Sequence, residues 1–375
     1  MQRCRFTFGN PLADGDIAET RWRDERLEWH GMASRPPPTS SQVLASTSIP
    51  LLSPTGLRDQ DSSLKVSNPN SINSSKCADA RPVNADGFGV GWYDTELEDS
   101  VPCVFQAITP AWSNRNLHRL AEKIRSPLVF AHVRASTTGA LSEENCHPWI
   151  YGSLLWMHNG NISGFTKIKR HLQNELSEEF FHFPQGDTDS EWAFALFLNE
   201  LSKIADPKAT SFPYVTLKEV MLLTIEKIKC WWVQAGVQEP CRMNFAVTDG
   251  RSVVATKYVT SSTEDAASLF FSTGTSFEPS KQVNIPPPTY LDDDHQPRPA
   301  EQYRMQKYDK REKIVLIASE PLTFEKTDWI EIPCQTLVVV TPKMNVLQFP
   351  IIDEFVDNVY KTGISLTSKT FYPVE

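Results

Sequence analysis

An arginine and an asparagine-glycine pair stand at the ends of two apolar runs, where side chains of these types could hold a substrate. In FAHVRASTTGA, Arg134 directly follows the run LVFAHV. A guanidinium grips a carboxylate with two parallel hydrogen bonds, which a lysine cannot reproduce. An arginine at a strand end is also an ordinary surface residue, so this motif alone does not decide between the two roles.

The second motif is LLWMHNGNISGF, in which Asn159 offers a side-chain N–H and Gly160 a backbone N–H with no Cβ beside it. Two such donors that converge on one point form an oxyanion hole. Asn-Gly is equally the commonest dipeptide of tight turns, and that alternative stays open.

Two further stretches, NADGFGVGWY and GDTDSEWAF, also carry residues suited to a binding site. Three glycines within five residues, beginning at Gly87, would let the backbone approach a ligand, or would form a turn into a strand. Asp187 and Asp189 flank a threonine before an amphipathic helix. Either aspartate could cap that helix, or one carboxylate could face a cleft and bind an ammonium group.

The four motifs together supply a carboxylate grip, an ammonium partner and an oxyanion hole. These contacts would hold the α-amino acid end of a γ-glutamyl group and stabilise attack on its side-chain amide. Cys146 and His147 are not expected to act as a nucleophilic pair, because neighbours in an extended segment point to opposite faces. A zinc site is not expected from His132, His147 and His158, since HExxH and CxxC spacings are absent. No metal or other cofactor is therefore expected.

Strands and helices that could position these motifs follow in a mixed order. Strands are predicted at FGVGWY, SPLVFAHVRAST, GSLLWMHNG, SLFFSTG, KIVLIAS and QTLVVVTP, and a hairpin at MNFAVTDGRSVVATKY, across Asp249-Gly250. Helices are predicted at NRNLHRLAEKIRS, KIKRHLQNELSEEFF, GDTDSEWAFALFLNELSKI and TLKEVMLLTIEKIKCWWVQAG, the last ending at Gly236. This order favours an α+β fold of helices layered on sheets, without regular βαβ alternation.

Composition sets the outer limits on organisation and partners. The 375 residues carry a net charge of -9 with no basic run, which argues against nucleic acid as a partner. No apolar run approaches 18 residues, so no membrane span is expected. Seven scattered cysteines and the lack of a secretory pattern predict a cytoplasmic protein. Residues 10–80 read as low-complexity, either disordered or misassigned, and a Pro-rich acidic loop is predicted near 284–305.

The motifs NADGFGVGWY, SPLVFAHVRAST, ENCHPW, LLWMHNG and GDTDSEWAFALFL, in this order, resemble a class II glutamine amidotransferase domain of the N-terminal-nucleophile hydrolase superfamily. They look most like the amidotransferase subunit of the fungal alternative glutathione-degradation complex. The resemblance covers most of residues 81–375 and implies a four-layer αββα sandwich. It also implies a larger partner subunit with WD-repeat and metallopeptidase-like regions.

The resemblance also implies roles for individual residues. Arg134 would hold the substrate carboxylate, Asp189 the substrate amino group, and Asn159 with Gly160 the oxyanion. The expected supporting residues are Asn84, Asp86, Gly87, His132, His147 and His158. The family's nucleophile is an N-terminal cysteine in a Met-Cys-Arg-Phe start, and Cys4-Arg5-Phe6 matches it, so residues 1–9 would form the nucleophile strand.

Three residues precede Cys4 in this sequence, where the family has one. The base in this family is the cysteine's own α-amine, and an amide bond to Arg3 would remove it. Two functions are therefore expected to compete. One is hydrolysis of a γ-glutamyl amide through a thioester, with glutathione as substrate, releasing glutamate and Cys-Gly, or otherwise with glutamine. The other is a catalytically inactive γ-glutamyl-binding subunit.

Overall fold

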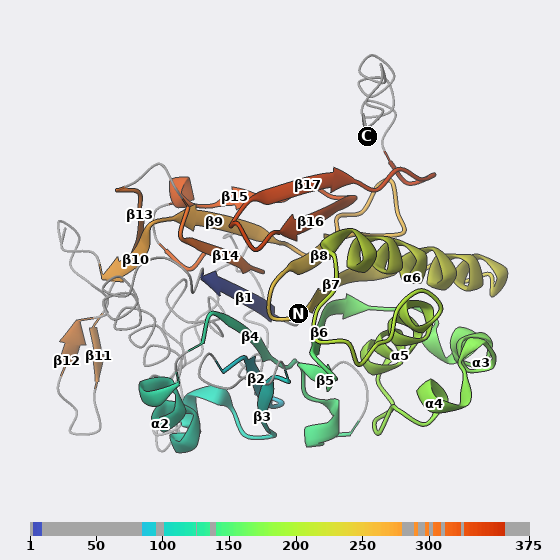
Figure 1. Ribbon diagram of the computed structural model, residues 1–375, viewed down its shortest axis with the longest axis horizontal. Coiled ribbons are helices and arrows are strands. Elements are labelled where there is room, and N and C mark those ends of the chain that lie inside the picture. The colour runs from blue at the N-terminus through green and yellow to red at the C-terminus, as the bar shows by residue number, and fades with distance from the viewer. Residues whose placement is uncertain are drawn as a thin grey trace, which may run out of the picture.

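The computed structural model describes residues 3–9, 85–94, 101–124, 126–135, 140–279, 289–291, 297–299, 303–308, 312–323 and 326–356. Two antiparallel sheets lie between layers of helix (Figure 1). The segment 10–80, expected to be low-complexity, lies outside the described residues, and so does Asn84.

The first sheet has seven strands and contains the candidate nucleophile strand near its middle. Its order is β15-β9-β14-β1-β4-β2-β3. The strands are β1 (Arg3–Gly9), β2 (Phe88–Trp92), β3 (Cys103–Ala107), β4 (Leu128–Val133), β9 (Phe270–Gly274), β14 (Ile314–Ala318) and β15 (Ile330–Glu331).

The second sheet has six strands in the order β17-β16-β8-β7-β6-β5. These are β5 (Trp149–Tyr151), β6 (Leu154–Asn161), β7 (Arg242–Thr248), β8 (Val253–Lys257), β16 (Thr336–Val340) and β17 (Val346–Pro350). The predicted hairpin is confirmed: β7 and β8 pair across a turn in which Gly250 has φ +81°. Asp249 Oδ1 accepts the backbone N–H of Ser252 at 2.8 Å, which fixes that turn.

The two sheets pack face to face, and alternation along β4 shows how. Leu128 and Phe130 lie in the cluster between the sheets, together with Leu155 and Met157 of β6. The intervening residues of β4 face the other way, as the two-residue period of a strand requires. That outer face is covered by helix α2 (Arg115–Lys123), and the buried residues shared by β4 and α2 are Val129, Ala131, Val133, Leu117 and Ala121.

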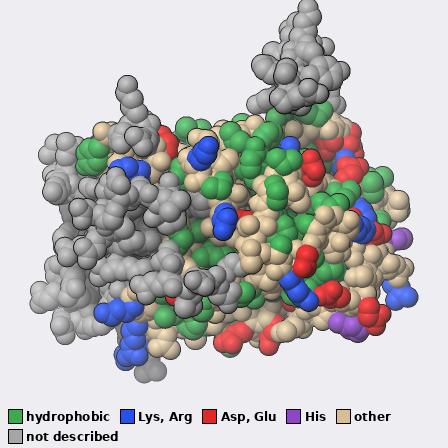
Figure 2. Space-filling view, viewed as in Figure 1, with side chains coloured by type: hydrophobic (Ala, Val, Ile, Leu, Met, Phe, Trp, Pro, Cys, Tyr) green, Lys and Arg blue, Asp and Glu red, His purple; other side chains and the backbone are tan. Residues whose placement is uncertain are grey.

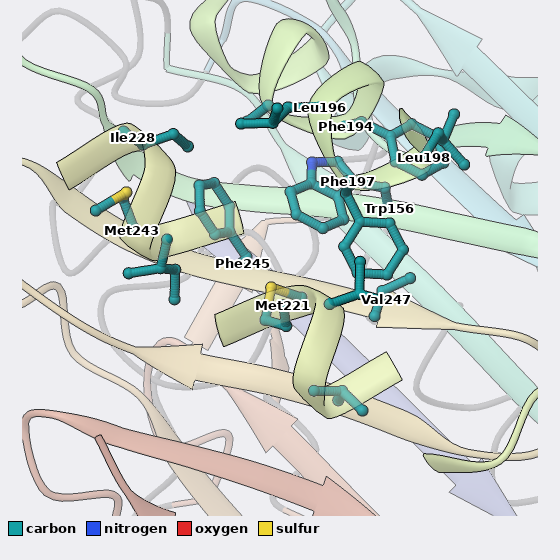
Figure 3. Close-up of a cluster of buried hydrophobic side chains, with 14 of the residues drawn as sticks. Trp156, Phe194, Leu196, Phe197, Leu198, Met221, Ile228, Met243, Phe245 and Val247 are labelled. Atoms are coloured by element: carbon teal, nitrogen blue, oxygen red, sulfur yellow. The ribbon is translucent and has the colours of Figure 1, made fainter. Parts of the chain in front are cut away.

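The outer face of the second sheet is covered by α3 (Phe165–Glu175), α4 (Glu178–Phe181), α5 (Asp189–Ser202) and α6 (Tyr214–Gln234). The Trp156 ring of β6 stacks on Phe194 of α5, with centroids 5.4 Å apart, and also contacts Phe245 of β7 (Figure 3). Burial of these aromatic rings fixes α5 against β6, the strand that carries the candidate oxyanion hole. The α+β class and the αββα layer order are confirmed.

Two predicted elements differ in detail. The helix predicted over KIKRHLQNELSEEFF is two helices, because Leu176 is extended and the Ser177 N–H donates to Asn199 Oδ1 at 2.9 Å. The predicted loop near 284–305 contains strand pairings, through β11 (Thr289–Leu291), β12 (Pro297–Pro299) and the start of β13 (Tyr303–Gln306). Prolines are accepted there because a two-stranded sheet has only edge strands.

The surface over α3–α6 carries acidic and basic side chains side by side (Figure 2). Within the part of the chain that the structure describes, no helix has both the length and the apolar character needed to cross a bilayer.

Candidate active site

Strand β1 places Cys4 between two other strands. Cys4 pairs with His132 of β4, and Arg5 pairs with Ala318 of β14. When the β1–β14 register is continued by one residue, Ser319 falls opposite Cys4. The backbone of the candidate nucleophile thus pairs with His132 on one side, and on the other side Ser319 directly follows Ala318, the residue of β14 that pairs with Arg5.

The candidate oxyanion strand reaches this position from the other sheet. Asn159 is buried near the end of β6, and its Nδ2 donates to Ser319 Oγ at 3.1 Å. This bond joins β6 of one sheet to the residue after β14 of the other, beside the nucleophile strand. Gly160 cannot be replaced without movement, because a Cβ there would lie 1.9 Å from the carbonyl oxygen of Arg242.

Asp189 lies at the start of α5, but it does not cap the helix. Thr188 is the N-cap and accepts the Glu191 N–H at 3.3 Å, while Asp187 is exposed. The expectation that one of the two aspartates could be the cap is therefore corrected. Asp189 is half-buried, and its Oδ2 accepts the backbone N–H of Ile162 at 2.6 Å. The candidate ammonium-binding carboxylate is thus tied to the chain just beyond Gly160.

His158 supports the same corner through both ring nitrogens. Nε2 lies 2.9 Å from the Arg242 carbonyl oxygen, which can only accept, so Nε2 carries the proton. Nδ1 lies 2.8 Å from Ser190 Oγ, and the Ser190 hydroxyl donates to Asp189 Oδ1 at 3.1 Å. Burial lowers the pKa of His158, and the nearby Asp189 carboxylate opposes that shift. His158 therefore links β6 to the first turn of α5.

Arg134 is buried, with 2% of its surface exposed, so it is not the surface residue that its position in the sequence equally allowed. Its backbone N–H donates to the Gly87 carbonyl at 2.8 Å, and its own carbonyl accepts the Asp86 N–H at 3.3 Å. Gly87 has φ +109°, and a Cβ there would lie 2.8 Å from Cys146 Sγ. The turn at Asp86 and Gly87 therefore holds the backbone of Arg134.

Asn145 is a buried residue of this corner that the sequence reasoning missed. Its Nδ2 donates to the Ala140 carbonyl at 3.1 Å, and Arg134 Nη1 donates to the same oxygen at 3.2 Å. Its Oδ1 packs against Gly186, where a Cβ would lie 2.3 Å away. Asn145 thus connects the Arg134 segment with the segment just before Asp189. Its signal in the sequence is its place in the motif ENCHPW, beside Cys146 and His147.

The side chains of His132 and His147 are buried and contact each other. Their ring centroids are 3.9 Å apart, and His147 also contacts the ring of Trp149. Burial, followed by the charges of His158 and Arg134, lowers the pKa of His132 to about 3. Burial also holds the pKa of His147 well below its usual value. Within the described residues, neither ring nitrogen of His132 has a hydrogen-bond partner.

Cys146 is unsuited to nucleophilic attack, because burial raises the pKa of its thiol to about 11 despite the nearby Arg134 charge. Across the residues that the structure describes, no three His, Cys, Asp or Glu side chains gather closely enough to hold a metal ion.

The structure thus gathers the predicted residues into two connected groups. One group consists of Asn159, Gly160, Asp189 and His158. The other consists of Arg134, Asp86, Gly87, His132 and His147. The two groups adjoin, because strand β4, which carries His132, contacts strand β6, which carries His158. Only the backbone pairing of Cys4 is described. Such an arrangement offers a buried cation, a carboxylate and a side-chain amide N–H to a small molecule that bears a carboxylate and an ammonium.

Comparison with known proteins identifies relatives of the chain. Residues 71–265 match the family model of class-II glutamine amidotransferases. The probable glutamine amidotransferase DUG3 of Saccharomyces cerevisiae is 49% identical over 284 residues, which are 73% of this chain and 74% of that protein. The gamma-glutamyl-hercynylcysteine sulfoxide hydrolase of Mycobacterium tuberculosis is 33% identical over 81 residues, 21% of this chain and 33% of that protein. A glutamine aminotransferase class-II domain protein of Silicibacter pomeroyi superposes with a TM-score of 0.47 and 22% identity, covering 71% of this chain and 92% of that one.

Proposed function

Since the chain belongs to the class II glutamine amidotransferases, we propose that it hydrolyses a γ-glutamyl amide bond with Cys4 as the nucleophile. The observation that carries the proposal is the hydrogen bond between Asn159 and Ser319, which brings an oxyanion donor beside the strand of Cys4. The proposed donor and the proposed nucleophile lie on strands of different sheets, β6 and β1.

The α-amino acid end of the substrate would lie between Arg134 and Asp189. Arg134 is a buried cation, and its guanidinium would hold a substrate carboxylate through two parallel hydrogen bonds. Asp189 offers the opposite charge at the end of the oxyanion strand, where the substrate ammonium would bind. A γ-glutamyl group carries both charges on its α-carbon, so the pair would select this group and leave the γ-carbonyl toward Asn159.

The reaction follows from these positions. The Cys4 thiolate would attack the γ-carbonyl carbon, and the Asn159 side-chain N–H and the Gly160 backbone N–H would stabilise the oxyanion. The C–N bond would then break, the leaving amine would take the proton that came from the thiol, and a γ-glutamyl thioester would remain. Water would hydrolyse the thioester to glutamate and regenerate the thiol. The proton acceptor would be the α-amine of Cys4 after removal of residues 1–3.

We propose glutathione as the substrate, so that Cys-Gly replaces ammonia as the leaving group. Support comes from the family resemblance and from the Mycobacterium tuberculosis relative, whose name places a γ-glutamyl group on a cysteine derivative. The test is to incubate the purified protein with glutathione or with glutamine, and to measure glutamate, Cys-Gly and ammonia. Release of glutamate and Cys-Gly from glutathione, well above ammonia release from glutamine, is expected; a preference for glutamine would overturn the choice of substrate.

We also propose a cytoplasmic location and a larger partner subunit with WD-repeat and metallopeptidase-like regions. Both rest on the resemblance of the motifs. Purification from native cytosolic extract, followed by mass spectrometry of the proteins that co-elute, tests them together. Co-elution with a chain of that class is expected, and a lone chain at the monomer mass would contradict the proposed partner.

A second function, binding without catalysis, is favoured by one observation. Arg3 is part of strand β1 and pairs with Val133, so the strand continues through the residue before Cys4. In a chain that keeps Arg3, the nitrogen of Cys4 is an amide and cannot accept the thiol proton. Such a chain would bind γ-glutamyl compounds and release no glutamate.

A further inference from the structure

The hydroxyl of Ser319 touches the oxyanion donor itself. Ser319 follows strand β14 directly, and only 4% of its surface is exposed. Its Oγ accepts a hydrogen bond from Asn159 Nδ2, although 160 positions separate the two residues in the sequence. Asn159 is equally buried, at 2%. The contact therefore lies in the interior between the sheets, shielded from competing water.

An asparagine amide needs such a contact before it can serve as an oxyanion donor. The torsion that rotates the amide is soft and roughly two-fold, so packing alone does not fix which end faces the substrate. Nδ2 carries two N–H bonds in one plane, and one of them is used by Ser319. Within the described residues, Asn159 Oδ1 has no hydrogen-bond partner, so the Ser319 contact is what sets the orientation of the amide.

We propose that Ser319 is a positioning residue of the oxyanion hole. By accepting one N–H of Asn159, it directs the other N–H at the γ-carbonyl oxygen of the substrate. A rotated amide would present its own oxygen to the developing negative charge and would repel it. This inference rests on the proposed function and adds to it a residue that lies in neither the carboxylate site nor the ammonium site.

The role predicts a particular kinetic effect. Oxyanion stabilisation acts in the transition state, so loss of the positioning contact lowers kcat and leaves KM nearly unchanged. Removal of a whole oxyanion donor costs roughly 100- to 1000-fold in kcat. Ser319→Ala leaves the donor in place but free to rotate, so we expect a smaller loss, of roughly 10- to 100-fold.

The experiment compares the full-length wild type, Ser319→Ala and Ser319→Thr, with γ-glutamyl-p-nitroanilide and glutathione as substrates. Thr keeps the Oγ atom, so it should retain kcat within about 3-fold, whereas Ala should lose it. Full kcat in the Ala variant would overturn the inference, and so would equal losses in both variants. If the wild type releases no p-nitroaniline or Cys-Gly, or if a Cys4→Ala variant releases them equally well, the proposed function itself would be overturned.

A double-mutant cycle covers the case in which Ser319→Ala affects folding. If Ser319 acts through Asn159, then adding Ser319→Ala to Asn159→Ala should lower kcat by less than about 2-fold further. A further loss as large as in the single variant would show that the two residues act independently, and the inference would fail.

Discussion

Asp189 Oδ2 accepts the backbone N–H of Ile162 at 2.6 Å, so the carboxylate proposed to bind the substrate ammonium is fixed to the chain two residues beyond Gly160. The end of β6 therefore positions both the proposed ammonium-binding carboxylate and the proposed oxyanion donors. Their separation is a property of the backbone and does not depend on long flexible side chains. A fixed separation of this kind would select substrates by the distance between their ammonium group and their amide carbonyl.

Neutralising this carboxylate should weaken substrate binding. Asp189→Asn keeps the size of the side chain but loses the charge, and a charge-assisted hydrogen bond contributes about 1.5–3 kcal/mol. We expect KM for the γ-glutamyl substrate to rise roughly 10- to 100-fold. The matched control is Asp187→Asn, at an exposed position two residues earlier. Equal KM values for both variants and the wild type would exclude Asp189 from the ammonium site.

Replacement of Arg134 by lysine should not preserve binding, although the charge is kept. A lysine presents one ammonium and cannot form the two parallel bonds of a guanidinium. We expect roughly 10-fold weaker binding of glutamate in a calorimetric titration, or weaker still. Arg119→Lys, on the exposed surface of α2, is the control and should bind glutamate as the wild type does. Unchanged affinity in Arg134→Lys would argue for a purely structural arginine.

Asn145 should influence binding through Arg134. The Asn145 side-chain amide and the Arg134 guanidinium both donate to the Ala140 carbonyl oxygen. Asn145→Ala removes the first of these two hydrogen bonds and leaves the second in place. We predict a rise in KM of about 3- to 10-fold with little change in kcat, because a neutral hydrogen bond contributes about 1 kcal/mol. Steady-state kinetics of this variant check it, and a fall in kcat at constant KM would contradict the assignment.

Gly160 should be required by the fold as well as by the chemistry. A Cβ there would lie 1.9 Å from the Arg242 carbonyl oxygen, so Gly160→Ala must push β6 away from β7. We expect the free energy of unfolding to fall by at least about 2 kcal/mol. Gly236→Ala is the comparison, since that residue has φ +63° with no atom within 4 Å of the added carbon. Gly236→Ala should lower the free energy of unfolding by about 1 kcal/mol, which is the strain of an alanine in the left-handed conformation. Similar urea midpoints for the two variants would refute the predicted clash.

The buried histidines should make the protein less stable in acid. The pKa of His132 is about 3 in the folded chain, against an ordinary value of 6.5, so the unfolded chain binds more protons between these two values. Stability therefore falls as the pH falls through this window, and His132 alone contributes about 2 kcal/mol of that loss at pH 5.

His132→Phe keeps a ring beside His147 and cannot titrate. Its melting temperature should fall less between pH 7 and pH 5 than that of the wild type. His171→Gln, on an exposed position of α3, is the control and should keep the wild-type slope. A His132→Phe slope equal to that of the wild type would show that His132 is already protonated in the folded protein at pH 5.

How much of the site the sequence predicts depends on how local each signal is. Arg134 ends an apolar run and Asp249-Gly250 joins two others, so both could be placed by patterns a few residues long. The contact between Asn159 and Ser319 could not, because 160 positions separate them and nothing near Ser319 marks it as a partner. The cap at Thr188 was missed because threonine and aspartate compete for that position with similar preference. Strands as short as β5 carry too few residues to show a period.

Labelling of the native protein with a diazoketone analogue of glutamine, followed by peptide mass spectrometry, tests whether Cys4 is the nucleophile. We predict one γ-glutamyl-like adduct, on Cys4, in a peptide that begins with that cysteine. An adduct on Cys146 or another cysteine, or an unlabelled chain that still carries Arg3 before Cys4, would contradict it.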